Sequence, residues 1–377
     1  MKTTLLLFLA VAVSKGAFAL EGVRKVEYRQ LGPLRGRWIL TEDNQTVPPD
    51  SFRRGLQTSG LFYDRGLLWA VGDQRSQYPG HLFLIDPATA RLVGKPIRME
   101  APEKHDNPLM EKYRALPNSD LEGLTRHPHD RNTLFAVTED KHQWIIELRV
   151  ESAGGVPIDT SGSLRRQAAG SKVRVRIVQI TPLRFPEALR PFRDDTNSRL
   201  EGLTTLADED SLILSYERLH DELPRLFRLS IDEARSGRPA APTPLAMDFA
   251  AVERRSNKSR ARLNLNGLVS RRHANRSFCI ALARDQERVL VLDCNIGHVL
   301  RSVDLDFRSP DGQAMLWVSP EAVALDRESG RLWIINDPDS IRGNYRLLKD
   351  GKALGKFADY TPLLFEVDIE SVLGGLP

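Results

Sequence analysis

The sequence lacks several features that would point to common classes of protein. It has two cysteines, so at most one disulfide can form within the chain. Residues with helical periodicity are scarce and confined to short segments such as "NPLMEKYRAL" and "IDEARSG", which excludes a mainly helical fold. No block of basic residues interleaved with aromatics occurs, so nucleic acid is not an expected partner. After the N-terminus, no apolar run approaches the length of a transmembrane segment.

Two motifs of hydrolytic enzymes are also absent. The sequence contains neither HExxH, which binds zinc, nor GxSxG, which forms the nucleophile elbow of α/β-hydrolases. The net charge is +4 and the cations are mostly arginine. This charge is compatible with anionic substrates or with a cell-envelope surface, and it selects neither.

The first nineteen residues have the pattern of an export signal. Lys2 is the positive residue, "TLLLFLAVAV" is the apolar core, and Ala17-Phe18-Ala19 is a small-x-small cleavage site. We therefore predict a signal peptide over 1–19 and a periplasmic or secreted protein, residues 20–377, in one domain. An uncleaved anchor or a lipoprotein is the alternative, but no cysteine follows the apolar core.

Two nearly identical stretches, "NSDLEGL" from Asn118 and "NSRLEGL" from Asn197, show that the chain contains internal repeats. Each begins a short strand that leads through a polar turn into a second, strongly apolar strand. The other copies are weaker: "PEAVALDRESGRLWIIND" from Pro320, "TSGLFYDRGLLWAVGDQ" from Thr58 and "NLNGLVSRRHANRSFCIALARD" from Asn264. Third and fourth strands are expected after most copies.

Four-stranded units repeating along a chain are typical of a β-propeller. The fold class is therefore all-β, with five blades visible. The last unit lacks an obvious fourth strand, which "VRKVEYRQL" near the N-terminus would supply by closing the ring with the C-terminal strands. The alternative is a sixth blade near "RGRWIL".

Propeller geometry predicts a cluster of carboxylates. The start of the first strand and the end of the second lie on the same face of each blade. Glu122, Glu201 and Glu321 occupy the first position, and Glu139, Glu217 and Asp337 the second. Long insertions, which often carry binding sites, fall on this face as well: 101–119, 184–199, 308–318 and 338–361. We therefore expect the carboxylates to surround one mouth of the central channel.

Like charges in a narrow mouth need neutralisation. Calcium, which takes oxygen ligands, is the expected cofactor, held by Glu122, Glu201, Glu321, Glu139 and Asp337. Two alternatives remain open. The glutamates can bond to backbone amides and hold the blades together, or arginines can neutralise them without metal. Arg218 and Arg342 are expected at the same mouth, where an arginine can also hold a phosphate or carboxylate.

Cys279 and Cys294 flank "IALARDQERVLVLD", which has the pattern of two strands joined by a turn at residues 285–287. In such a hairpin the two cysteines face each other or nearly so, and an exported protein can oxidise them. We predict a disulfide. Two buried free thiols are the alternative.

The motifs "DLEGL…TLFAVTED", "LEGLTTLADEDSLILSYER" and "PEAVALDRESGRLWIIND" resemble the phytase-like domain family, also called the esterase-like activity of phytase family. The resemblance covers roughly residues 50–370 and implies an exported bacterial propeller that hydrolyses esters. The more specific activity that it implies is that of a calcium-dependent phosphoesterase. Two copies depart from the pattern, because Ser59-Gly60 and Asn266-Gly267 replace Glu-Gly.

The leading functional hypothesis is an exported hydrolase acting on a small ester, lactone or phosphoester. Glu201 or Glu217 would act as general base toward water beside the calcium ion, and Arg218 or Arg342 would steady an anionic group. The alternative is a non-catalytic envelope module that recognises a glycan, peptide or partner protein through its loop-rich face. Binding without turnover would distinguish the second from the first.

Overall fold

A computed structural model gives the fold. The described residues are 26–47, 55–74, 76–102, 107–116, 121–139, 143–152, 158, 164, 167–168, 172–186, 199–206, 210–217, 223–246, 252, 263–273, 276–338 and 360–376. The predicted signal peptide lies outside them. None of the helices in this part of the chain is both long enough and apolar enough to cross a membrane.

Most of the described chain forms antiparallel sheets, and the strands within each sheet follow one another in sequence. The first sheet in the chain contains β3 (Thr58–Asp64), β4 (Leu67–Gly72), β5 (His81–Asp86), the short β6 (Arg91–Leu92) and β7 (Ile97–Glu100). The next contains β8 (Leu121–Arg126), β9 (Thr133–Thr138), β10 (Trp144–Ser152) and β11 (Val173–Pro182). A short parallel pairing of β7 with β11 joins these two sheets edge to edge.

The remaining strands form three further sheets. One contains β12 (Leu200–Leu206), β13 (Ser211–Tyr216), β14 (Arg225–Ser230) and β15 (Thr243–Pro244). Another contains β16 (Leu268–His273), β17 (Arg276–Ala283), β18 (Arg288–Asp293) and β19 (Val299–Arg308). The last contains β20 (Pro320–Leu325), β21 (Arg331–Asn336) and β22 (Leu363–Asp368).

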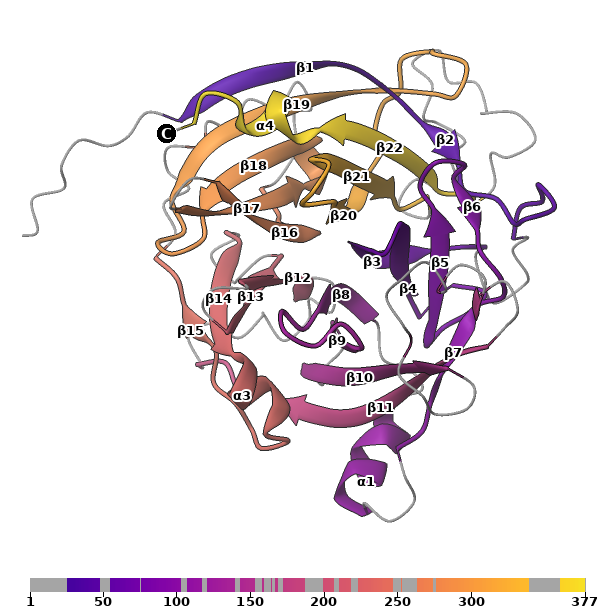
Figure 1. Ribbon diagram of the computed structural model, residues 1–377. Helices are drawn as coiled ribbons and strands as arrows, with labels where there is room; N and C mark the ends of the chain where they lie inside the picture. The colour runs from indigo at the N-terminus through magenta and orange to yellow at the C-terminus, as the bar shows by residue number, and fades with distance from the viewer. Residues whose placement is uncertain are drawn as a thin grey trace, which may run out of the picture.

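The sheets are arranged radially about a common centre (Figure 1). The first strand of each sheet is innermost, and these strands contact one another in a closed cycle: β3 with β8, β8 with β12, β12 with β16, β16 with β20, and β20 with β3. Apolar side chains fill the layers between neighbouring sheets, as Phe135, Leu214 and Phe227 do between the β8–β11 and β12–β15 sheets. This arrangement is a β-propeller, in agreement with the prediction.

Glycines in the repeated motif allow the inner strands to approach closely. A side chain at Gly60 would collide with the backbone of Glu122 in the next sheet. The same holds around the ring: a Cβ at Gly123 would lie 2.5 Å from Leu203 N, one at Gly202 2.5 Å from Asn266 O, and one at Gly267 2.7 Å from Val323 N. The repeated glycine is therefore required where each inner strand touches the next one.

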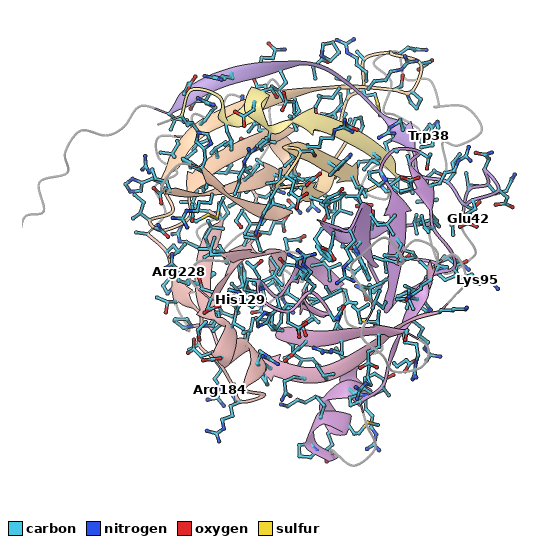
Figure 2. All side chains as sticks on the ribbon, viewed as in Figure 1. Trp38, Glu42, Lys95, His129, Arg184 and Arg228 are labelled. Atoms are coloured by element: carbon cyan, nitrogen blue, oxygen red, sulfur yellow. A yellow bond between two sulfur atoms is a disulfide. The ribbon has the colours of Figure 1, made fainter. Side chains whose placement is uncertain are left out.

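The N-terminal segment pairs differently from the prediction. β1 (Glu27–Arg35), which includes most of "VRKVEYRQL", does not complete the last sheet but adds in parallel to β19. The edge of the last sheet is β2 (Arg37–Trp38), within "RGRWIL", and it pairs with β22 near the C-terminus. Figure 2 shows Trp38 at the outer rim, as expected for an outermost strand. N- and C-terminal strands thus share a sheet.

The helices are few and short. α1 (Asn107–Ala115) and α3 (Ile231–Arg235) lie in the two segments with helical periodicity, and α4 (Ile369–Leu373) ends the described chain. Ser230 and Glu233 form a capping box at the start of α3, which satisfies two backbone N–H groups there.

The predicted disulfide is present. Cys279 lies in β17 and Cys294 directly follows β18, with 5.0 Å between their Cα atoms. The turn between the strands is the 3₁₀ helix η3 (Arg284–Gln286). Both cysteines are buried, so the bond lies in the apolar layer between sheets and fixes the β17–β18 hairpin.

Arg301, a fully buried arginine in β19, ties the two ends of the described chain together. Its Nε donates to Glu27 Oε2 in β1 at 2.9 Å, and its Nη1 donates to the backbone carbonyls of Val372 at 2.6 Å and Gly374 at 3.2 Å. One guanidinium therefore holds both the parallel strand β1 and the end of α4 against the β16–β19 sheet.

We predict that Arg301→Met lowers the free energy of unfolding by about 3 kcal/mol, because buried carbonyls lose their donor and Glu27 loses one of its two arginine partners. Denaturant unfolding measures the change. Arg29→Met is the matched control, because Arg29 also pairs with Glu27 but is 35% exposed, and it should lose less than about 1 kcal/mol. Equal losses in the two variants would contradict the anchoring role of Arg301.

Candidate functional site

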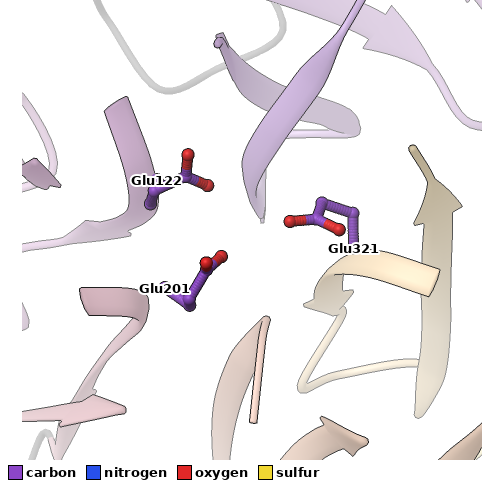
Figure 3. Close-up of side chains that lie close together, drawn as sticks. All are labelled: Glu122, Glu201 and Glu321. Atoms are coloured by element: carbon purple, nitrogen blue, oxygen red, sulfur yellow. The ribbon is translucent and has the colours of Figure 1, made fainter. Parts of the chain in front are cut away.

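Three glutamates project from the starts of inner strands into the centre of the ring. Glu122, Glu201 and Glu321 are each the second residue of their strand, and each is at least 93% buried. The strand register shifts at each of them, which is the mark of a β-bulge. Bulges redirect side chains, and here the three carboxylates point toward one another (Figure 3).

Two more glutamates join them from the ends of second strands. Glu139 directly follows β9 and Glu217 directly follows β13, and both are buried. Carboxylate oxygens of Glu122, Glu201 and Glu321 lie within 4.8 Å of one another, and so do those of Glu139, Glu201 and Glu217. Glu201 belongs to both triads. We call these five residues the axial glutamate cluster.

Arg284, which sequence reasoning did not identify, supplies a positive charge inside the cluster. It follows β17, the second strand of its sheet, at the place where Glu139 and Glu217 follow theirs. Its Nη1 donates to both carboxylate oxygens of Glu321, at 2.9 and 3.1 Å, and its Nη2 donates to Glu217 at 2.7 Å. Its place directly after a second strand is the sequence signal that indicates this face of the propeller.

Two asparagines also donate hydrogen bonds to the cluster. Asn266 stands where the repeat elsewhere has glutamate, and its Nδ2 donates to Glu201 at 3.1 Å and to Glu321 at 3.3 Å. Asn264 Nδ2 donates to Glu217 at 3.0 Å. The departure from Glu-Gly in this copy therefore replaces a sixth carboxylate by a donor that bridges two of the others.

Burial and mutual repulsion shift the titration of the cluster. Burial is the largest cause of a pKa of Glu201 well above its usual value, and the charges of Glu139, Glu217 and Glu321 raise it further. Burial likewise raises the pKa of Glu321 to about 7, against the opposing effect of Arg284. Buried carboxyls that repel one another hold protons near neutral pH unless a cation replaces them.

The remaining predicted site residues stand as follows. Asp337 belongs to neither triad; it accepts from Gln57 Nε2 at 3.3 Å, and its charge contributes to the raised pKa of Glu321. Arg218 and Arg342 lie outside the described residues. The structure thus brings together four of the predicted metal ligands, Glu122, Glu139, Glu201 and Glu321, together with Glu217.

The donor set suits a hard divalent cation. All of the cluster's side chains offer oxygen, and calcium takes six to eight oxygen ligands, whereas zinc sites favour nitrogen and sulfur. Two buried oxygens also have acceptor capacity: Glu217 Oε2 and Asn266 Oδ1 have no hydrogen-bond partner among the described residues. Against five glutamates, Arg284 supplies a single positive charge.

No protein-family model matches the sequence, and no curated protein matches it significantly. The phytase-like resemblance therefore stays a prediction. Similar solved structures include the glutaminyl cyclase of Myxococcus xanthus (14% identity, TM-score 0.42, covering 89% of this chain and 96% of that one). They also include the PQQ-bound aldose sugar dehydrogenase of Streptomyces coelicolor (13%, 0.37, 84% and 97%) and the Malassezia sympodialis allergen Mala s 1 (13%, 0.39, 87% and 82%). At these TM-scores the likenesses carry no argument about function.

The raised pKa values predict how stability depends on pH when metal is removed. In excess EDTA, the folded protein keeps protons on Glu201 and Glu321 that the unfolded chain releases above its ordinary pKa of 4.5. The folded state then binds more protons, so its stability falls as pH rises from about 4.5 to about 7. Glu321→Gln removes one titrating group and should flatten this fall.

Denaturant unfolding at several pH values between 4.5 and 8, for both proteins, measures the effect. The informative quantity is the difference between wild type and Glu321→Gln, because titrating groups outside the axial glutamate cluster contribute equally to both. A difference that does not change with pH would contradict a raised pKa for Glu321.

Proposed function

We propose that the axial glutamate cluster binds a divalent cation, calcium first, and that the protein is an exported five-bladed propeller hydrolase of small esters, lactones or phosphoesters. The observation that carries the cation site is the convergence of five buried glutamates, with Glu201 common to both triads. The buried disulfide and the absence of a membrane-spanning helix among the described residues agree with export to an oxidising compartment.

The residues of the cluster have separable roles in this proposal. Glu122, Glu201 and Glu321 would hold the cation at the starts of the inner strands, with Glu139 on the side of the second triad. A bound calcium ion would supply Lewis-acid polarisation of a carbonyl or phosphoryl oxygen. Asp337 would add negative charge beside Glu321.

A carboxylate that accepts a proton at neutral pH is the second requirement. Glu201 is the proposed general base, and burial raises its pKa well above its ordinary value, which favours the uptake of a proton. Glu217 is the neighbouring candidate, and Arg284 Nη2 fixes one of its oxygens at 2.7 Å. Arg218 and Arg342 remain the proposed partners of an anionic substrate group.

One set of contacts favours the alternative, a non-catalytic envelope module. Arg284 joins Glu217 of one sheet to Glu321 of another, and Asn266 joins Glu201 to Glu321. These bonds connect inner strands and would hold the ring closed without any metal. The two candidates differ in whether calcium stabilises the protein and whether substrate turns over.

The mature chain, residues 20–377, should gain thermal stability on transfer from excess EDTA to millimolar calcium. At a hundred times the dissociation constant, a ligand that binds only the folded state adds about 2.7 kcal/mol. Glu201→Gln should lose most of the gain, because Glu201 serves both triads. Glu147→Gln is the control, since Glu147 is equally buried but pairs with Arg235 away from the cluster.

Arg284→Gln separates a metal site from purely structural bonding. Without its cation the metal-free protein should be destabilised by about 3 to 5 kcal/mol, because Glu217 and Glu321 lose their partner. If the cluster binds calcium, the variant should bind it more tightly than wild type, since a competing positive charge is gone. Destabilisation without any response to calcium, in the variant and in wild type, would mean that the glutamates only hold the ring together.

A substrate panel of aryl esters, lactones and phytate tests the hydrolase. We expect calcium-dependent turnover of at least one compound, reduced at least about a hundredfold by Glu201→Gln and unchanged by Glu147→Gln. A calcium-dependent thermal shift with no turnover on any compound would overturn the hydrolase and leave the binding module as the function.

A further inference from the structure

The opposite end of the axis carries a second cavity, of about 290 Å³. Its walls come from the other ends of the inner strands and from the turns that follow them. Glu122 lies at the start of β8, in the axial glutamate cluster, whereas Thr125 and Arg126 lie at the end of the same strand and line the cavity. The same relation holds for Glu201 and Thr205 in β12, so about four residues, or roughly 13 Å of strand, separate the two sites.

The floor of this cavity is a group of buried hydroxyls. Thr125, Thr204, Thr205 and Ser270 are each at least 93% buried, and three neighbouring inner strands contribute them. Thr125 Oγ1 lies 3.4 Å from Thr205 Oγ1, and Thr204 Oγ1 donates to Ser270 Oγ at 3.3 Å. A polar floor of this kind suits a ligand with hydroxyl or oxyanion groups rather than an apolar one.

The rim is rich in arginine. Arg65, Arg126, Arg131 and Arg327 line the cavity with three acidic residues, Asp64, Asp326 and Glu328, which leaves an excess of one positive charge (four minus three). This is the reverse of the other end of the axis, where carboxylates dominate. An anion is therefore the favoured type of ligand.

Two of the acidic groups are already engaged by the protein. Asp64 accepts from Arg126 Nη1 at 2.5 Å and pairs with Arg65 Nε at 3.0 Å. Asp326 accepts from the backbone N–H of Glu328 at 3.0 Å within its own turn. Arginines thus neutralise the charge of Asp64, and Asp326 is held within its own turn.

Donors remain for an anion. Within the described part of the chain, Nε and Nη2 of Arg126 have no hydrogen-bond acceptor, and Arg126 is 26% exposed. The exposed Arg131 has no ion-pair or hydrogen-bond partner for its guanidinium among the described residues. Both line the same cavity, so an oxyanion placed between them would receive bonds from two guanidinium groups.

We propose that this cavity binds a small hydroxylated anion, with its phosphate or carboxylate group on Arg126 and Arg131 and its hydroxyls on Thr125 and Thr205. The site is separate from the axial glutamate cluster and does not depend on calcium. Its existence is therefore independent of the hydrolase proposed above.

Titration calorimetry in excess EDTA tests the proposal, with inorganic phosphate, glycerol 3-phosphate and acetate as probes. We expect saturable binding of at least one probe, with glycerol 3-phosphate tighter than inorganic phosphate if the hydroxyl floor contributes. Arg131→Gln should weaken binding roughly tenfold, the effect of losing one charge-assisted hydrogen bond. Because Arg131 has no partner in the described chain, this variant should fold normally.

Arg238→Gln is the matched control, since Arg238 is likewise exposed and its guanidinium has no hydrogen-bond or ion-pair partner among the described residues, but it lies outside the cavity. It should bind the probes as wild type does, and so should Glu201→Gln. Preference for phosphate over acetate identifies a phosphorylated ligand, and the reverse a carboxylated one. No saturable binding of any probe, equal binding by Arg131→Gln and wild type, or binding that requires calcium would each overturn the proposal.

Discussion

The close approach of neighbouring inner strands governs the rest of the structure. Gly60, Gly123, Gly202 and Gly267 each lie where a side chain would collide with the backbone of the next sheet, so the ring can close only because these positions lack a Cβ. The residue before each glycine is then carried to the axis. Two of those residues are glutamates, Glu122 and Glu201, and Glu321 lies at the corresponding place before Ala322; the bulges at these three positions turn the carboxylates inward. Packing of the ring and assembly of the acidic cluster therefore depend on the same positions, and a substitution at a motif glycine would disturb both.

Bringing carboxylates together in a buried space is unfavourable, and among the described residues Arg284 and Asn266 offset part of this cost without metal. Arg284 pairs with Glu217 and Glu321, and Asn266 donates to Glu201 and Glu321. Arg284 carries one positive charge and Asn266 carries none, so these two side chains do not neutralise the charge of five glutamates. The pKa values of Glu201 and Glu321 are raised accordingly. A cluster that holds protons in this way is poised to exchange them for a cation, because both neutralise the same excess of negative charge. The same residues can therefore both hold the blades together and bind a cation. The cation would neutralise the negative charge that Arg284 does not.

The repeats made much of the fold predictable. Spacing of the five copies indicated the strand order, and the rule that first-strand starts and second-strand ends share a face brought Glu122, Glu139, Glu201, Glu217 and Glu321 together correctly. The pairing of the N-terminal segment could not be predicted in the same way. β2 has only two residues, which are too few to show any periodicity, and most residues of β1 are partly or fully exposed. Neither sequence therefore predicts the strand with which it pairs. Arg284 was missed for a different reason: an arginine after a strand is unremarkable until the carboxylates around it are known.

The same inner strands determine both ends of the axis. Glu201 is the second residue of β12 and Thr205 is the sixth, so the two side chains lie at opposite ends of the channel. A shift of one residue in the pairing of β12 with β13 would remove both from the axis together. In the two "LEGLT" copies the glutamate lies at one mouth, and the threonine, Thr125 or Thr204, lines the cavity near the other. The turns after β3, β8 and β20 then add Arg65, Arg131 and Arg327 at the hydroxyl end alone. The glutamates beside the contact points of the inner strands make one mouth acidic. The arginines in the turns that follow these strands make the other mouth basic.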